Sequence, residues 1–481
     1  MSTDYPFEEI IERARKGRDA IYPYKDEISR FSVFGADLHT QSRRFHTLDD
    51  ILITAPQFTP HRLEKAYDLV FREPFFRDVD LTREIGGFKT KLPIVQSSMG
   101  SPEDWNAVAP YSAKVCAKKG MIYGIGENVA ATWGYDERTD PSQPCLMDRI
   151  LSYFEHKIDG YGGVVIQQNE EDAQNELWNR IYSDKRLTPY IEEGLIAFEI
   201  KGGQGAKSGI GGEKIVDRDT ALRLQDKGYI IHPDPQEVDQ SVYERHSAAD
   251  IFTEEILKNR ILKLRNDYPR VRIWLKTGPY RDLLSVIRVA TEAGIDAVSI
   301  DGKEGGTGMS PTAALQHLGL PTLACLNAVR DARAEGIETS IIISGRIHDG
   351  SQIVKALALG ADAAAMGRPF LIAANAYPLS KLFIGKEFYK FKWIKKLARM
   401  IYPPSERSEK LIENFLETVE LEIQLLISSL GKYDLSLVSD EDIAATSIGL
   451  AQAMNLKHLY GGFSSSGNID RPLIQPLDQL E

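Results

Sequence analysis

The feature that most constrains the fold is a repeated alternation of short apolar runs with amphipathic stretches. Nearly continuous apolar runs are typical of parallel strands that are buried on both faces. Eight such runs occur, at residues 92–98, 120–126, 162–168, 194–201, 271–277, 297–302, 340–345 and 363–367. The stretches 281–294 and 351–360 carry apolar residues at helical spacing and end on glycine. Eight strand–helix units predict an α/β protein, a (β/α)8 TIM barrel in preference to an open doubly wound sheet.

The length of the chain, 481 residues, suits one barrel with appendages. We expect an N-terminal extension, mostly helical, over 1–90, the barrel over 91–383, a C-terminal helical segment over 384–460 and a tail over 461–481. An amphipathic helix is expected over 408–431. The glycine-rich stretch 201–214 begins an unusually long connection, and such connections at barrel strand ends usually carry lids or substrate contacts.

Charge and cysteine content narrow the classes of function. The net charge of −11, from 58 basic and 69 acidic residues, argues against nucleic acid as the main partner. The first thirty residues contain no signal-peptide core, and no apolar run reaches the roughly 18–20 residues that span a bilayer, so we expect a cytoplasmic protein. Cys116, Cys145 and Cys325 lie far apart and form no CxxC. We therefore expect three buried thiols, no iron–sulfur cluster and no metal site.

Two glycine–arginine pairs follow the seventh and eighth strands, where barrels most often bind a phosphate. The sequence reads Ser344-Gly345-Arg346 at one end and Met366-Gly367-Arg368 at the other. In each, the glycine lets backbone N–H groups approach an anion and the arginine can pair with it. Two such triplets indicate a cofactor with a monophosphate tail. The alternative is a pair of ordinary left-handed turns.

Other strand ends carry groups that suit the ring of a cofactor. Lys276 ends the fifth strand and needs an anionic partner in the barrel mouth. That partner is either a reduced flavin ring, whose potential a cation tunes, or a barrel carboxylate. After the sixth strand, Asp301 precedes a run of glycines that would fold tightly against a ligand, unless the loop is merely flexible. These glycines are Gly302, Gly305, Gly306 and Gly308.

Polar residues also end the first three strands. Ser97 and Ser98 suit hydrogen bonds to a ring edge. Glu127 is a candidate for binding an ammonium or imine, or for acid–base catalysis, with a charge at a helix N-terminus as the alternative. Gln167 and Gln168 either donate to a ligand carbonyl or satisfy barrel backbone.

Three segments resemble the FMN-binding synthase domain of glutamate synthases and the free-standing proteins built from it. Lys201-Gly-Gly-Gln204-Gly-Ala-Lys207-Ser-Gly-Ile-Gly-Gly212 is similar to the family's K-x-x-Q-G-A-K-P-G-x-G-G run. Asp301-Gly-Lys-Glu-Gly-Gly-Thr-Gly308 is similar to its D/G-H/K-D/E-G-G-T-G run, and Arg245-His246-Ser247 to its histidine-bearing segment. The similarity covers roughly residues 45–375.

The resemblance implies that FMN lies across the barrel mouth and that reduced FMN passes hydride to 2-iminoglutarate, formed from 2-oxoglutarate and ammonia, to give L-glutamate. The residues implied to bind FMN are Ser97, Ser98, Lys276, Asp301, Gly302, Gly305, Gly306, Ser344, Gly345, Arg346, Gly367 and Arg368. Those implied to hold the carboxylates of the 2-oxo acid, or to lie at its site, are Lys201, Gln204, Lys207 and His246. Catalytic roles are expected for Glu127, Lys201 and Lys276.

The chain departs from the family's large enzymes in two respects. Those enzymes begin with a glutaminase domain bearing an N-terminal cysteine, whereas residue 2 here is Ser2. Their cysteine cluster after the eighth strand is replaced by NAYPLSKLFIGKEF (375–388). We therefore expect ammonia or an amine to arrive freely or from a separate amidotransferase, and electrons from a separate donor subunit. Ser208 and Lys303, at positions where the family often has proline and histidine, point to a changed substrate, such as an alkylamine.

Two alternatives stay open. The first is another FMN enzyme acting on a 2-oxo or hydroxy acid, an oxidase or an isomerase. A hydroxy-acid oxidase should carry a histidine just before an arginine near the seventh strand, but here His348 follows Arg346. The second is a flavoprotein subunit of a larger complex without activity of its own.

Overall fold

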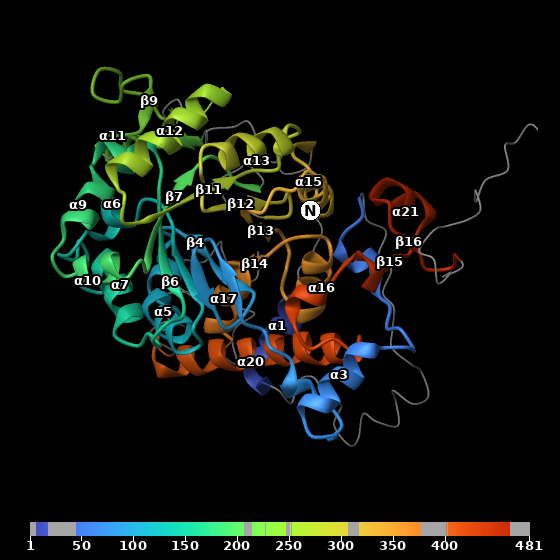
Figure 1. The fold of residues 1–481 in the computed structure, drawn as a ribbon. Coiled ribbons are helices and arrows are strands. Elements are labelled where there is room, and N and C mark those ends of the chain that lie inside the picture. Colours follow the sequence, from blue (N-terminus) through green and yellow to red (C-terminus); the bar gives the residue numbers. More distant parts are fainter. Residues whose placement is uncertain are drawn as a thin grey trace, which may run out of the picture.

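The protein is an eight-stranded parallel barrel surrounded by helices (Figure 1). The structure is a computed structural model and describes residues 6–17, 45–205, 214–226, 228–246, 251, 253–305, 317–376, 401 and 403–461. In chain order the barrel strands are β4 (Ile94–Met99), β5 (Ile122–Ile125), β6 (Gly163–Gln168), β7 (Ile196–Lys201), β11 (Arg272–Thr277), β12 (Ala297–Asp301), β13 (Ser340–Ser344) and β14 (Ala363–Met366). Neighbours in this order pair in parallel, and β14 closes the barrel on β4. All eight predicted runs are barrel strands, so the predicted TIM barrel is confirmed.

The barrel interior changes from apolar to polar along its strands. One buried apolar cluster includes Val95, Ile122, Val165, Ala197, Trp274, Ala297, Ile342 and Ala363. Because side chains alternate along a strand, residues two positions further on point into the same interior. On five strands these next residues are polar and buried: Gln167, Glu199, Lys276, Ser299 and Ser344. Polar groups therefore gather at the carboxyl end of the barrel.

A hairpin closes the other end of the barrel. Its strands are β2 (Arg83–Ile85) and β3 (Phe88–Thr90), and the side chains of Ile85 and Phe88 belong to the interior apolar cluster. The indole Nε1 of Trp274 donates to the Gly86 carbonyl at 3.1 Å. Gly86 has φ 54°, and a Cβ there would lie 2.5 Å from the Trp274 ring, so only glycine fits this turn. Within the described part of the chain, the hairpin thus fills one end of the barrel and leaves the carboxyl end for a ligand.

Helices cover the outside of the barrel in the order that a (β/α)8 fold requires. They are α4 (Glu103–Asn106), α5 (Ala109–Lys118), α6 (Val129–Trp133), α7 (Leu146–Phe154), α8 (Glu170–Gln174), α9 (Leu177–Ser183), α10 (Thr188–Glu192), α12 (Glu254–Asp267), α13 (Leu283–Glu292), α15 (Thr322–Ala334), α16 (Gly350–Ala358) and α17 (Arg368–Ala374). The stretches with helical spacing are α13 and α16. Asp349 begins α16 as an N-cap that accepts from the Gln352 N–H.

Segments from both ends of the chain pack together beside the barrel (Figure 1). The amphipathic helix expected over 408–431 is α20 (Glu406–Ser429), which contacts α1 (Phe7–Lys16), α5, α16 and α17. Strand β1 (Ile51–Ile53) pairs with β15 (Ile443–Ala445), which pairs in turn with β16 (Lys457–His458). Helices α3 (Pro60–Asp68) and α21 (Ile448–Met454) complete these segments. The described part of residues 1–90 thus contains three strands as well as the expected helices.

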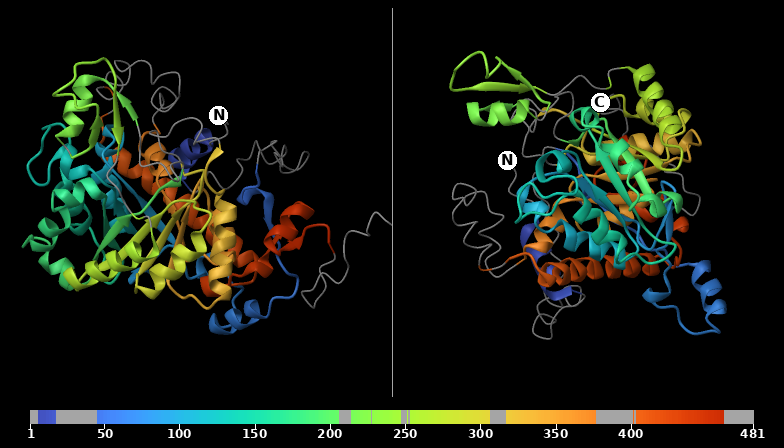
Figure 2. Two further views of the ribbon diagram at one scale, coloured as in Figure 1. Left: turned by 90° about the horizontal axis from the view of Figure 1, so that it is seen from above. Right: turned by 90° about the vertical axis from the view of Figure 1, so that its left-hand side faces the viewer.

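The long connection after β7 forms a small unit of its own. It consists of β8 (Lys214–Val216), α11 (Arg218–Gln225), β9 (Ile230–His232) and β10 (Tyr243–His246), with the strands in the antiparallel order β8–β10–β9. Figure 2 shows this unit projecting from the barrel. The predicted residues Lys207 and Gly306, and most of the ranges 384–400 and 461–481, lie outside the described residues. Over the part that the structure describes, every helix is too short or too polar to cross a membrane.

Candidate active site at the carboxyl end of the barrel

The side chains of Lys276 and Asp301 form an ion pair inside the barrel mouth. Lys276 Nζ lies 3.3 Å from Asp301 Oδ2, and the two residues are 6% and 8% exposed. Asp301 also accepts a hydrogen bond from the hydroxyl of Ser344 on β13. Burial alone would lower the pKa of Lys276, but Asp301, Glu199 and Glu127 together raise it. The structure therefore contains the carboxylate partner that the sequence left as one of two possibilities for this lysine.

A second ion pair joins Lys201 to Glu127. Lys201 Nζ lies 3.0 Å from Glu127 Oε1 and donates to Gln167 Oε1 at 3.3 Å. Burial opposes ionisation of Glu127, but the charge of Lys201 outweighs it, and the pKa of Glu127 is lowered. Glu127 directly precedes Asn128, the N-cap residue of α6, yet its carboxylate is held by the lysine. It is therefore an ionised group of the barrel mouth.

Glu199 is a buried carboxylate of this site that the sequence analysis missed. It is 3% exposed, and its Oε2 accepts from Ser98 Oγ and from Gln167 Nε2, both at 2.6 Å. Burial raises the pKa of Glu199 although the charge of Lys276 opposes this. Its signal in the sequence is a single carboxylate in an otherwise apolar strand, two residues after Ala197 and two before Lys201.

Glycines bring three loops into backbone contact above these ion pairs. A Cβ on Gly205, after β7, would overlap the carbonyl oxygens of Gly302 and Gly305, after β12. A Cβ on Gly203 would lie 2.7 Å from the Gly278 nitrogen, after β11. Both contacts leave room for backbone only. Gln204, between these two glycines, is thereby placed at the mouth with Lys201 and Lys276.

The turn after β13 is built around Thr322 as well as around its own glycine. Gly345 has φ 132° and Arg346 has φ 57°, and a Cβ on Gly345 or on Gly302 would overlap the Thr322 hydroxyl. That hydroxyl donates to Glu304 Oε2 at 2.6 Å, and burial raises the pKa of Glu304. The glycine is therefore required by packing, whatever binds to the backbone N–H groups. Thr322 was not predicted from the sequence, and Glu304 was noted only as part of the glycine-rich run, without a role of its own.

The ends of β14 and β4 lie together across the point where the barrel closes. Gly367 is the N-cap residue of α17, and a Cβ there would lie 3.3 Å from Met99 Sδ and 3.5 Å from Ser97 Cβ. Arg368 follows as the first residue of the helix. Because β13 and β14 are neighbours, both predicted phosphate-binding turns lie on one side of the mouth, and the Gly367 turn lies next to Ser97.

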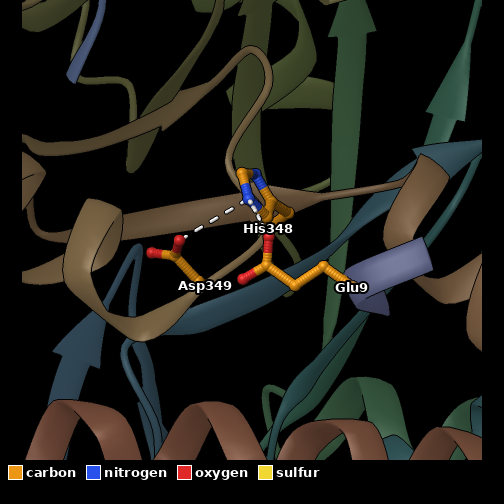
Figure 3. Close-up of side chains that lie close together, drawn as sticks. All are labelled: Glu9, His348 and Asp349. Atoms are coloured by element: carbon orange, nitrogen blue, oxygen red, sulfur yellow. Dashed lines mark ion pairs between the residues drawn. The ribbon is translucent and has the colours of Figure 1, made fainter. Parts of the chain in front are cut away.

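Two histidines that the sequence singled out lie apart from these ion pairs. His246 ends β10 in the inserted sheet, where its Nε2 is 3.3 Å from Glu244 Oε2. His348 is buried beside α1 (Figure 3), with Nε2 3.7 Å from Glu9 Oε2 and 3.5 Å from Asp349 Oδ2. Burial lowers the pKa of His348, but these two carboxylates raise it above its ordinary value. The three side chains in Figure 3 thus form a charged contact between α1 and the loop after β13.

The cysteines are buried single thiols. Cys116, Cys145 and Cys325 are each buried and outside any disulfide. Cys145 Sγ donates to the Asp136 carbonyl at 3.2 Å, and burial raises the pKa of all three thiols. The prediction that the three cysteines are buried thiols is therefore confirmed.

Comparison with known proteins gives one clear family. A family model described as a conserved region in glutamate synthase matches residues 187–432. A glutamate synthase large subunit-like protein of Rhizobium meliloti is 32% identical over 320 residues, which are 61% of this chain and 68% of that protein. An archaeal-type glutamate synthase (NADPH) of Dehalococcoides mccartyi is 31% identical over 272 residues, 54% of this chain and 51% of that protein.

A solved structure of a flavocytochrome b2 variant with benzoylformate superimposes with a TM-score of 0.48 at 12% identity. The superposition covers 84% of this chain and 78% of that one. Of the two relatives named above, the chain spans about two thirds of the Rhizobium protein and about half of the Dehalococcoides one.

Proposed function

Because the chain belongs to the glutamate synthase family, we propose that it is an FMN-dependent oxidoreductase that reductively aminates 2-oxoglutarate, or a related 2-oxo acid. The product is L-glutamate, or an N-substituted glutamate if the nitrogen comes from an amine. The observation that carries the proposal is the pair of lysines, Lys201 and Lys276, beside Gln204 at the carboxyl end of the barrel.

The residues at the mouth fit FMN. The interior below them is filled by apolar side chains, so a ligand must lie across the mouth. The turns at Gly345 and Gly367 offer backbone N–H groups and following arginines to a phosphate, and Lys276 offers a fixed positive charge to the ring. Asn128 Oδ1 is a buried acceptor for which the described residues provide no donor, as expected beside a ligand or ordered water. When bound and reduced by a separate electron donor, FMN would supply the hydride.

The protein's own groups would bind and orient the substrates. Lys201 and Gln204 offer a cation and an amide to the carboxylates of the oxo acid. Glu127, whose pKa is lowered, is ionised at neutral pH and can therefore hold an ammonium ion or accept a proton, but cannot donate one. Placing the two substrates in one water-poor mouth contributes mainly through proximity.

A single mixing experiment tests this proposal. The purified protein is photoreduced without oxygen and mixed with 2-oxoglutarate, with ammonium, and with both, while flavin absorbance is followed. Reoxidation only with both substrates is expected. Reoxidation only with an alkylamine in place of ammonium would identify the N-substituted product. If no mixture reoxidises the bound flavin, the proposed reaction is contradicted. If the protein cannot bind FMN, the proposed cofactor is contradicted.

A further inference from the structure

We propose that Glu199 is a positioning residue that allows two buried lysines to lie side by side at the barrel mouth and that orients the polar groups presented to ligands. The consequence for catalysis rests on the proposed function. The structural role does not, because it follows from contacts within the protein alone.

The strand register creates the need for such a residue. Lys201 on β7 and Lys276 on β11 are Cα partners in neighbouring parallel strands, and both point into the barrel. Their side chains are 13% and 7% exposed, so solvent screens their mutual repulsion poorly. Each lysine has one carboxylate of its own, Glu127 or Asp301. Glu199 is the third carboxylate of the group, and its field acts on both lysines.

Glu199 also fixes which way the Gln167 amide faces. Gln167 Nε2 donates to Glu199 Oε2 at 2.6 Å, so the amide turns its oxygen away from Glu199. Its Oε1 then faces Lys201 Nζ at 3.3 Å and accepts from it. Through Gln167, Glu199 thereby helps to hold the ammonium group of Lys201, which lies two residues further along the same strand.

The same oxygen of Glu199 orients Ser98. Ser98 Oγ donates its proton to Glu199 at 2.6 Å, which leaves only acceptor lone pairs on that oxygen. A ligand that contacts Ser98 must therefore donate. The charged groups that face Glu199 are Lys276 and Lys201, with Asp301 and Glu127 behind them, and its uncharged neighbours are Ser98 and Gln167.

The test compares Glu199→Gln with the matched control Glu192→Gln, the same change on an exposed residue of the preceding helix α10. FMN dissociation constants are measured by fluorescence from pH 6 to pH 10, and thermal unfolding of the apoprotein is followed over the same range. Without the charge of Glu199, the pKa of Lys276 is expected to fall, because burial lowers this pKa and Glu199 is one of the groups that oppose the effect of burial. The alkaline loss of FMN affinity should then move about one pH unit toward neutrality, with affinity about tenfold weaker at pH 9.

The apoprotein measurement separates the two proposals. In Glu199→Gln the charged form of Lys276 would be destabilised, so the deficit in unfolding midpoint should shrink as pH rises and Lys276 loses its proton. If the wild type binds no FMN, the proposed function fails, but this pH trend still decides the role of Glu199. A Glu199→Gln protein that matches the control in both measurements would overturn the inference.

A charge-balanced double variant covers the case in which Glu199→Gln does not fold. Combining it with Lys201→Met removes one charge of each sign. If Glu199 supports the lysine pair, the double variant should fold and recover most of the lost unfolding midpoint. A double variant as unstable as the sum of the single changes would also overturn the inference.

Discussion

Lys201 and Lys276 are direct neighbours across two parallel strands, and each is held by a different carboxylate. Lys201 Nζ lies 3.0 Å from Glu127 and Lys276 Nζ lies 3.3 Å from Asp301. Breaking either pair would leave a buried charge without its partner, which typically costs about 3–5 kcal/mol. This arrangement concentrates positive charge where an anionic cofactor and a dicarboxylate would meet, and the predictions below test its parts.

Lys276→Met is expected to weaken FMN binding by at least about tenfold and to lower the reduction potential of the bound flavin. The physical reason is the loss of a fixed positive charge that stabilises the reduced, anionic ring. Fluorescence titration gives the dissociation constant and a redox titration gives the potential. Lys258→Met, on the exposed side of α12, is the control. Wild-type values for both quantities in Lys276→Met would remove this lysine from the cofactor site.

Gln204→Ala is expected to raise the KM for the 2-oxo acid about tenfold while flavin content stays unchanged. Its side chain is assigned to the substrate, and one lost hydrogen bond to a charged group is worth about 1.5–3 kcal/mol. Steady-state kinetics and the visible spectrum check the two halves of the prediction. If the variant loses flavin, the division between cofactor and substrate residues is wrong.

Glu127→Gln is expected to lower kcat by about a hundredfold or more with little change in flavin affinity. The reason is that the ionised carboxylate is the only group assigned to ammonium binding or proton acceptance. Stopped-flow reoxidation of the reduced flavin isolates the affected step. A variant that is impaired only at subsaturating 2-oxo acid would instead place Glu127 at the substrate carboxylates.

Gly345→Ala is expected to destabilise the protein by about 2–4 kcal/mol, since it combines an unfavourable φ with overlap onto the Thr322 hydroxyl. Gly336→Ala is the matched control, because Gly336 has φ 80° but nothing within 4 Å of the added Cβ. The control should cost only about 1 kcal/mol. Urea unfolding measures both. Adding Thr322→Ala to Gly345→Ala should recover part of the loss, and equal costs for the two glycines would contradict the packing argument.

The contact in Figure 3 predicts a pH dependence of stability. His348 has a pKa raised above 6.5, so its contribution is fully present below pH 6.5 and is lost as pH rises through the raised pKa. Glu9 has a pKa lowered to about 2, so its contribution is present above its unfolded pKa and is lost as pH falls toward that value. His348→Gln should therefore remove up to about 1 kcal/mol at pH 6 and less at pH 9. Urea unfolding at the two pH values measures this, and an equal loss at both would contradict an ionised His348.

The sequence predicted the barrel well because a buried parallel strand leaves a visible apolar run, and glycines mark strand ends where backbone must pack closely. It predicted the lysines and Asp301 for the same reason, since they follow those runs directly. Glu199 was missed because it lies within a nearly continuous apolar run that was interpreted only as a buried strand. Thr322 lies about twenty residues after Gly302, so only the folded barrel shows that its hydroxyl fills the space beside two glycines.

The pairing of short elements that lie far apart in the chain could not be predicted from the sequence either. Strand β1 has three residues and its partner β15 comes near the other end of the chain, so no local pattern connects them. The hairpin that closes the barrel floor carries one apolar side chain per strand into the interior, too little for a periodic signal. His246 and Lys207 were grouped by resemblance alone, and His246 lies in the inserted sheet.

The pairing of β1 with β15 has a consequence for how the protein is made. Ile51 faces Ala445, so β1 cannot pair with β15 until residues 443–445 have left the ribosome. The barrel strands emerge between the two and can assemble first. Helix α1 likewise cannot complete its contact with α20 until Glu422, which pairs with Arg13, has been synthesised. A nascent chain stalled before residue 400 would thus expose the apolar faces that these two contacts cover, and we expect it to aggregate more readily than the folded protein.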